Sequence, residues 1–119
     1  MSNTNTIVDL INAGIQTESL RQKAIASNFA NLDTPGYRRL DVKFEEVLAA
    51  CSPISDTTDL SRTEPETYEP KQTPVKANGN DTSMEVEVGE MIKNSLRHKA
   101  YIRLLSRKYS QIELAISSK

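Results

Sequence analysis

The cleanest pattern of apolar and polar positions lies at the C-terminal end of the chain. Mostly apolar residues recur there at alternating spacings of four and three residues, which is the heptad pattern of a long helix packed along another helix. Thr82 and Glu85 have the spacing of a capping box, so the helix is predicted to begin near residue 84. A period-two alternation from Met84 to Val88 leaves open a short strand before it. The predicted seam comprises Met84, Val88, Met91, Ser95, His98, Ile102, Leu105, Tyr109, Ile112 and Ile116.

A second helix is predicted from about Ile7 to Asn31. Its apolar residues form two clusters with spacings of three and four, which favour a helix over a strand. Thr6 followed by Asp9 has the form of a capping box, and the polar residues 2–5 are expected to be disordered. Gln16, Thr17 and Glu18 interrupt the apolar stripe, so we expect an uneven seam.

The segment after this helix carries the sharpest local signal. Thr34-Pro35-Gly36-Tyr37 predicts a type II turn, because proline supplies the φ of the second position and glycine accepts the positive φ of the third. Asn28 and Asn31 suit helix ends, where their amides can bond freed backbone groups. Beyond the turn, a short helix capped by Asp41 is predicted. It would carry Phe44, Val47, Leu48 and Cys51 on one face and close at Pro53.

Residues 52–83 differ in composition from both ends. They hold four of the five prolines, and their six acids against three bases give a charge of −3. Such a segment buries little apolar area, so we expect a flexible or extended excursion, with at most a weak hairpin near Asn78-Gly79. The predicted architecture is all-α: one domain in which long N- and C-terminal helices pair as a coiled-coil-like antiparallel hairpin. Its parts are 1–51, an irregular Pro-rich 52–83, and 84–119.

Candidate chemistry is sparse in the 119 residues. The single histidine, His98, has no ligand-type partners at helical spacing, and the single cysteine, Cys51, lies on an apolar face, so we predict no catalytic residue, metal site or cofactor. No apolar window is long enough to span a membrane, and the first residues lack the features of a cleaved secretion signal.

The basic C-terminal stretch offers an alternative function. Residues 93–119 carry seven bases and one acid, although the net charge of the whole chain is −1. A basic helix of this kind can bind nucleic acid or an anionic membrane surface. The alternative hypothesis is therefore a helical nucleic-acid-binding protein of the cytoplasm.

Three stretches resemble one known family. The first runs Ser27-Asn28-Phe29-Ala30-Asn31-Leu32-Asp33-Thr34-Pro35-Gly36-Tyr37-Arg38; the second is Lys43-Phe44-Glu45-Glu46-Val47-Leu48, and the third is Leu104-Leu105-Ser106-Arg107-Lys108-Tyr109. Together they are similar to the bacterial flagellar axial proteins, the rod and hook components, and most of all to proximal rod proteins of the basal body. The resemblance covers roughly residues 7–50 and 90–116.

The resemblance implies a structural subunit that polymerises and transmits torque from motor to hook. Its implied partners are other rod proteins, copies of itself, the junction protein between the rod and the membrane ring and export gate, and the type III export apparatus, with no nucleic acid and no small-molecule substrate. The implied location is the basal body, reached without a cleaved signal peptide. It also implies that the corner lies among neighbouring subunits, through Asn28, Asn31, Pro35, Gly36, Tyr37 and Arg38.

Overall fold

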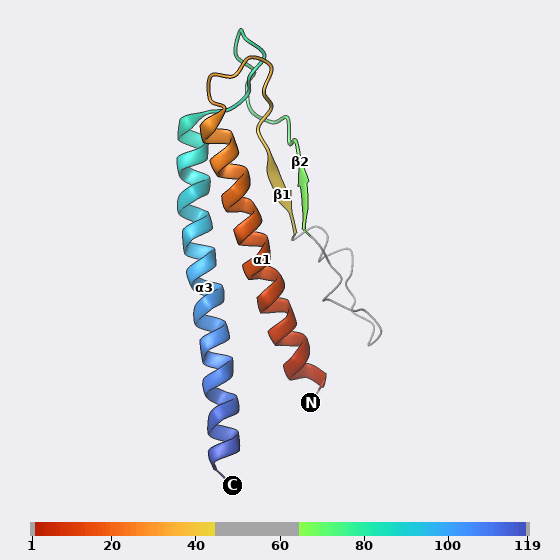
Figure 1. Ribbon diagram of the computed structural model, residues 1–119, viewed down its shortest axis with the longest axis vertical. Helices are drawn as coiled ribbons and strands as arrows, with labels where there is room; N and C mark the ends of the chain where they lie inside the picture. The colour runs from red at the N-terminus through yellow and green to blue at the C-terminus, as the bar shows by residue number, and fades with distance from the viewer. Residues whose placement is uncertain (1, 45–64, 119) are drawn as a thin grey trace.

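A computed structural model describes residues 2–44 and 65–118 of the chain. In these ranges it has two long helices, α1 (Ser2–Ala30) and α3 (Met84–Ser117), and two short strands, β1 (Asp41–Lys43) and β2 (Glu66–Tyr68). The helices run antiparallel side by side, so both termini lie at one end of a molecule measuring 66 × 27 × 15 Å (Figure 1). The predicted hairpin of two long helices is confirmed, and the strand pair must be added to it. A coiled-coil geometry stays a prediction.

The structure changes the predicted start of the first helix and the predicted cap of the second, whose start near residue 84 is confirmed. α1 begins at Ser2 and runs through Thr6, so the disordered start and the Thr6 cap are wrong. The polar residues there cost at most about 0.7 kcal/mol each in helix propensity, which a helix that has already nucleated can absorb. α3 begins at Met84 after an N-cap at Ser83 that makes no side-chain cap hydrogen bond, so the Thr82 capping box and the alternative strand are also wrong.

The turn after α1 is confirmed. The Tyr37 amide donates to the Thr34 carbonyl over 3.2 Å, and Gly36 has φ +75°, as the third position of a type II turn requires. A second loop meets this turn, because the Gly36 amide donates to the Asn78 carbonyl over 2.9 Å. Gly79 also has a positive φ of 85°, and a Cβ there would lie 3.4 Å from the Gly36 Cα. The two loops thus contact each other through backbone.

A strand replaces the start of the predicted short helix. Asp41 begins β1, which pairs antiparallel with β2 so that Val42 faces Thr67 and Lys43 faces Glu66. Val42 and Phe44, two residues apart, are 4% and 2% exposed, because alternate residues of this extended segment point inward and β1 lies on α1. The helix prediction is therefore wrong for 41–44, while Val47, Leu48, Cys51 and Pro53 lie outside the described residues.

The described part of the predicted excursion, residues 65–83, includes strand β2 and a deeply buried stretch that leads into α3. Asn80, Asp81 and Thr82 are at most 1% exposed. Composition did not predict this order, because these residues are buried through hydrogen bonds between polar groups and bury little apolar area. The division into 1–51, 52–83 and 84–119 stays a prediction.

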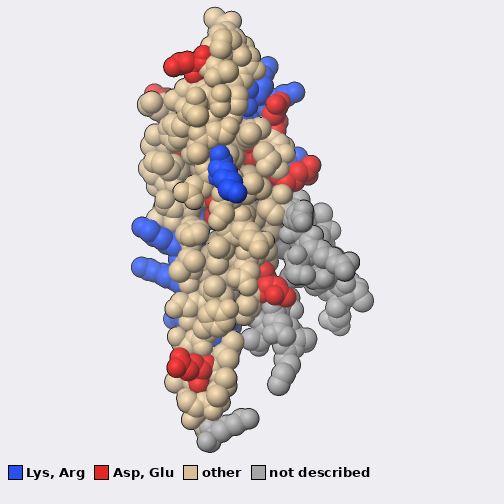
Figure 2. Space-filling model, viewed as in Figure 1, with Lys and Arg blue, Asp and Glu red and all other residues tan. Residues whose placement is uncertain are grey.

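Apolar burial in the described chain is thin. The buried apolar side chains are Ile11, Ala13, Ala24, Ile25, Val42 and Phe44, and the buried polar ones are more numerous. Many apolar side chains of α3 are exposed. The surface over the helices consists largely of residues other than Lys, Arg, Asp and Glu, with scattered charged residues of both signs (Figure 2). None of the described helices combines the length and the apolar character that a bilayer crossing requires.

Candidate functional site

The inner face of α1 is a heptad seam in which polar residues replace apolar ones. Ile11, Gly14, Glu18, Arg21, Ile25 and Asn28 follow one another at spacings of three and four, and all six are buried. Thr17 and Glu18, which interrupt the apolar stripe, are nevertheless buried, because each is only 1% exposed. The heptad continues through the polar residues, which the apolar pattern alone could not reveal.

Glu18 joins the two helices at the middle of this seam. Its carboxylate accepts a hydrogen bond from Asn94 Nδ2 over 2.9 Å, and the same amide nitrogen donates to the Glu18 carbonyl over 2.7 Å. Arg21 pairs with the carboxylate from the next turn of α1, and Arg97 Nη1 of α3 lies 3.7 Å from it. A buried carboxylate needs such partners, since an unpaired buried charge costs several kcal/mol.

One turn from Glu18 toward the termini, Gly14 of α1 lies against the ring of Tyr101 of α3. A Cβ placed on Gly14 would lie 2.5 Å from Cε1 and 2.6 Å from Cζ of the Tyr101 ring. The ring therefore occupies the space that any larger residue at position 14 would need. Gly14 costs helix propensity, and close packing of the aromatic ring compensates for it.

A second ionic cluster fixes the segment between the turn and β1 to α3. Arg39 Nε donates to Glu87 Oε1 over 2.8 Å, Arg39 Nη1 lies 3.6 Å from Asp41, and the Arg39 backbone amide donates to Asp81 Oδ1 over 2.7 Å. Glu87 is completely buried, and its Oε2 has no hydrogen-bond partner among the described residues. Arg39 is thus the main neutralising group for a carboxylate that lies out of water.

The pKa of Arg39 reflects this setting. Burial, the largest single influence, lowers it, but the hydrogen bond with Glu87 and the charges of Glu87, Asp41 and Glu90 together raise the pKa above its ordinary value. A guanidinium with a raised pKa contributes stability that is fully present at neutral pH and is lost only as pH rises through the folded-state pKa. Arg39 therefore remains charged under all ordinary conditions.

Asn28 closes the corner by acting as a backbone-like partner of Leu40. Its Nδ2 donates to the Leu40 carbonyl and its Oδ1 accepts from the Leu40 amide, both over 2.9 Å. The Tyr37 hydroxyl donates to the same Oδ1 over 3.0 Å and also lies 2.9 Å from the Ser27 hydroxyl. Because an amide side chain carries both a donor and an acceptor, one asparagine satisfies both backbone groups.

Asn80 binds the carbonyl groups of the turn that follows α1. Its Nδ2 lies 2.7 Å from the Asn31 carbonyl oxygen, 3.1 Å from that of Leu32 and 2.8 Å from that of Thr34. Lys76 Nζ adds a bond of 3.0 Å to the Leu32 carbonyl. The loop before α3 therefore holds the turn in place, and its cation lies just beyond the negative end of the α1 dipole.

These contacts decide where the predicted corner residues lie. Asn28 is completely buried within the chain, so it has no surface for a neighbouring subunit. Asn31 donates from its amide to the Ser27 carbonyl and accepts from the Thr34 hydroxyl. Pro35 and Gly36 are exposed at the tip, Tyr37 is half-buried, and Arg38 Nη1 lies 3.5 Å from Asp81 Oδ2. A contact of the exposed tip with other subunits remains a prediction.

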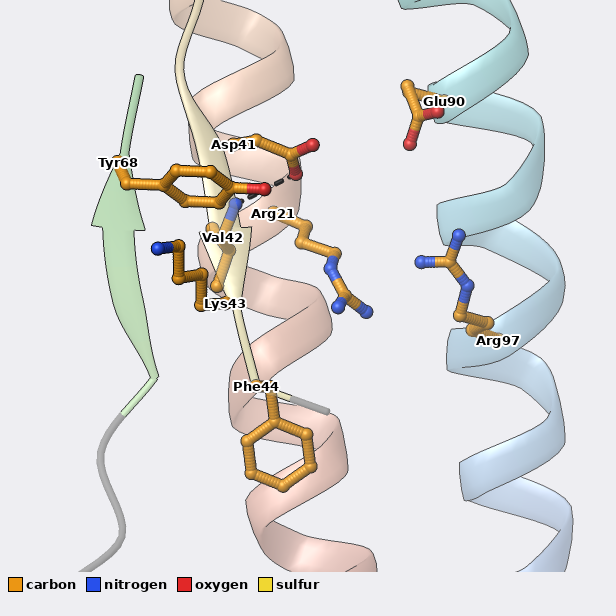
Figure 3. Close-up of a pocket in the computed structure, with 8 residues that line it drawn as sticks. All are labelled: Arg21, Asp41, Val42, Lys43, Phe44, Tyr68, Glu90 and Arg97. Carbon is orange, nitrogen blue, oxygen red and sulfur yellow. Dashed lines mark hydrogen bonds between the residues drawn. The ribbon is translucent and has the colours of Figure 1, made fainter. Parts of the chain in front are cut away.

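A hollow of about 320 Å³ opens beside the corner, between α1, the strands and α3 (Figure 3). Bases and acids both line it: Asp41 and Lys43 come from β1, Glu90 and Arg97 from α3, and Arg21 from α1. Lys43 Nζ lies 4.3 Å from the centroid of the Tyr68 ring. Because Glu18 already pairs with both arginines, the geometry fits a structural network better than a ligand site.

The predicted seam of α3 is rotated away from α1 along most of its length. Val88 is 38% exposed, Met91 and Ile102 are each 45% exposed, Tyr109 55% and Ile116 69%. Leu105 and Ile112 are half-buried, as is His98. The residues that meet α1 are instead Asn94, Arg97 and Tyr101, with Glu87 meeting Arg39. The exposed seam residues do not form the contact within the chain, and their contact with a helix of another subunit remains a prediction.

Among the described residues, no cluster of three or more His, Cys, Asp or Glu side chains has metal-binding geometry. The residues missed by the sequence prediction are Glu18, Arg21, Arg39, Asn80, Asp81, Glu87, Asn94 and Tyr101. All are polar or carry a polar tip, and the signal for the first two was their place in the α1 heptad.

Comparison with known proteins places the corner in a family context. The family model described as "Flagella basal body rod protein" matches residues 13–38, which comprise the buried half of α1 and the turn. Two curated relatives extend the similarity. The flagellar basal body rod protein FlgB of Bacillus subtilis is 25% identical over 96% of this chain and 95% of its own length. That of Borreliella burgdorferi is 22% identical over 98% and 99%.

A third FlgB, from Buchnera aphidicola, is 26% identical over 81% of this chain and 83% of its own length. The matches thus extend well beyond the turn motif and include both helices. The chain is similar to rod proteins in length as well as in sequence.

Proposed function

We infer that this chain is a flagellar basal body rod protein of the FlgB kind, and we propose that it is a structural subunit of the proximal rod. It polymerises with other rod proteins and transmits torque from motor to hook. The role requires no catalytic residue and no cofactor. The alternative of a nucleic-acid-binding protein finds no support among the relatives.

The observation that carries the proposal is the exposure of apolar side chains along α3. Met84 is 60% exposed, Leu96 63%, Leu114 67% and Ile116 69%, and exposed apolar side chains recur between them along the helix. A run of this kind marks a surface that other proteins cover. Helices packed on it would form a dry, dense interface, which gives a torque-bearing shaft its rigidity.

The fixed corner supports the same role. Both helices are joined at one end by buried hydrogen bonds and ion pairs, so the hairpin can act as a stiff rod element. Identical or related subunits repeated by a rotation and a rise that do not close build a helical tube. The partner at the base of the rod would be the junction protein that links the rod to the membrane ring and export gate. The chain would reach this place through the type III export apparatus, without a cleaved signal peptide.

Mass spectrometry of purified hook–basal-body complexes tests the proposal. We expect this chain in near-stoichiometric amounts with the other rod proteins of a flagellated bacterium that carries its gene. A chain that is missing from these complexes but abundant in the soluble cell fraction would overturn the structural role.

A further inference from the structure

A shallow groove on α3 has one apolar wall and one basic wall. Leu96, Ala100 and Leu104 form the apolar ridge at spacings of four residues, and Lys99, Arg103 and Arg107 form the neighbouring basic ridge. The groove has a volume of about 460 Å³. Leu96 is 63% exposed and Leu104 48% exposed, so the apolar wall is open to solvent.

This groove lies on the side of α3 that faces away from α1. Asn94 points at Glu18 of α1, and Leu96 lies two residues further on, which places it about 160° around the helix axis from Asn94. Lys and Arg side chains project from the edge of the molecule formed by α3, opposite α1 (Figure 2). The groove is therefore separate from the hairpin contact.

The basic ridge needs acidic neighbours, and the described helices do not provide them. On α1, Asp9 is the exposed acid, since Glu18 is buried. On α3, Glu85 and Glu90 lie near its start and Glu113 near its end, and Glu87 is buried in its pair with Arg39. Packing the described helices of a second copy here would add few opposite charges, and α3 against α3 would bring two basic ridges together.

We propose that this groove binds an amphipathic helix of a different protein, whose apolar seam is flanked by a row of Asp or Glu. The apolar ridge would bury the seam while the three cations pair with the acidic row, as helix-in-groove recognition requires. The proposal rests on the proposed function in that the partner would be another component of the rod. Nucleic acid fits less well, because a phosphate backbone would pair with the basic ridge but would leave the apolar ridge beside it uncovered.

Two synthetic helical peptides test this specificity on the full-length chain. Both carry the same leucine seam, and they differ only in flanking positions, which are Glu in one and Lys in the other. Fluorescence anisotropy should show the Glu peptide binding on the order of tenfold or more tightly, with an affinity that falls as salt increases. Equal affinity for the two peptides would overturn the proposal.

A charge-reversed variant locates the site. In Arg103→Glu/Arg107→Glu the preference should reverse toward the Lys peptide, while the control Lys23→Glu/Lys71→Glu, with the same net charge, should keep the wild-type preference. Circular dichroism confirms that both variants remain helical. Retained Glu-peptide binding in the first variant would place binding elsewhere and contradict the proposal.

Two other occupants give distinct outcomes. A dimer in sedimentation equilibrium that is lost in Leu96→Asp/Leu104→Asp would assign the groove to a second copy. Binding to a DNA duplex that is lost in Arg103→Glu/Arg107→Glu, without discrimination between the peptides, would assign it to nucleic acid. Either result would overturn the proposal, and neither depends on whether the chain is found in basal bodies, so failure here is distinguishable from failure of the rod assignment.

Discussion

The two ends of the hairpin use their side chains in opposite ways. At the corner, charged and amide side chains such as Asn28, Asp81 and Glu87 are buried, whereas toward the C-terminus Leu114 and Ile116 are about two-thirds exposed. The corner holds the chain together with directed hydrogen bonds. The terminal half of α3 leaves apolar surface uncovered. Such surface is rare on proteins that act as monomers and is typical of subunits that assemble.

The difference indicates that stability and assembly are assigned to separate regions. Hydrogen bonds and ion pairs require particular partners, so the corner fixes one arrangement of turn, strands and helices. Apolar surface is less selective and contributes only when another helix covers it. Substitutions in the two regions should therefore affect different measurements.

The largest effect is expected at Arg39. Arg39→Ala leaves Glu87 buried without its main cation, which should lower the free energy of unfolding by about 3–5 kcal/mol. Urea denaturation of the full chain measures this. The double variant Arg39→Ala/Glu87→Ala should lose clearly less than the sum of the two single losses. Strict additivity would show that the pair does not hold the corner.

Asn28 should rank second. Asn28→Ala leaves the amide and carbonyl of Leu40 without their partner, and we expect a loss of about 2–3 kcal/mol. Asn28→Asp is the matched control, because it keeps the acceptor for the Leu40 amide and Tyr37 but cannot donate to the Leu40 carbonyl. Its midpoint in urea should fall between those of wild type and Asn28→Ala, and equal midpoints for all three would refute the role.

A smaller loss is expected at the helix contact. Gly14→Ala places a methyl group against the Tyr101 ring, which costs about 1–3 kcal/mol in overpacking and regains up to about 1 kcal/mol in helix propensity. The net change in unfolding free energy should be a modest loss. Adding Tyr101→Leu should restore part of the lost free energy of unfolding. A stabilising effect of Gly14→Ala alone would show that the Tyr101 ring moves aside without cost.

The smallest change in stability should come from the exposed seam of α3. Met91→Gln and Ile102→Gln should alter the free energy of unfolding by less than about 0.5 kcal/mol, because both side chains are already in solvent. The same variants should nevertheless reduce incorporation into basal bodies and swimming in a complementation assay. Normal swimming with both substitutions combined would remove the exposed seam from the assembly surface.

The sequence predicted the features that depend on local or periodic signals. Pro35 and Gly36 predicted the turn, and the spacing of apolar residues predicted two long helices. The pattern did not predict which face of α3 meets α1. Asn94 and Tyr101 make that contact, and Asn94, as a polar residue, is not part of an apolar stripe. The pattern also missed β1, in which Val42 pairs with Thr67 of β2, a residue far along the sequence.

The sequence indicates a polar corner but not its contacts within the chain. Asn28 bonds Leu40, which lies twelve residues further along. Arg39 and Glu87 are more distant still, as are Asn80 and the turn after α1, and a single sequence carries no signal that joins such positions. A contact of the exposed Pro35 and Gly36 with other subunits stays a prediction.

Hydrogen exchange of backbone amides in the free full-length chain tests the central claim most directly. Opening free energies in folded chains range from near zero at fraying ends to the global value in the core. The account predicts slow exchange in residues 18–28 and 87–97, where buried polar contacts hold the two helices. It predicts fast exchange in residues 105–117, where the apolar side chains of α3 are largely exposed in the free chain. Equal protection of both parts of α3, or slower exchange at its C-terminal end, would contradict the assignment of stability to the corner.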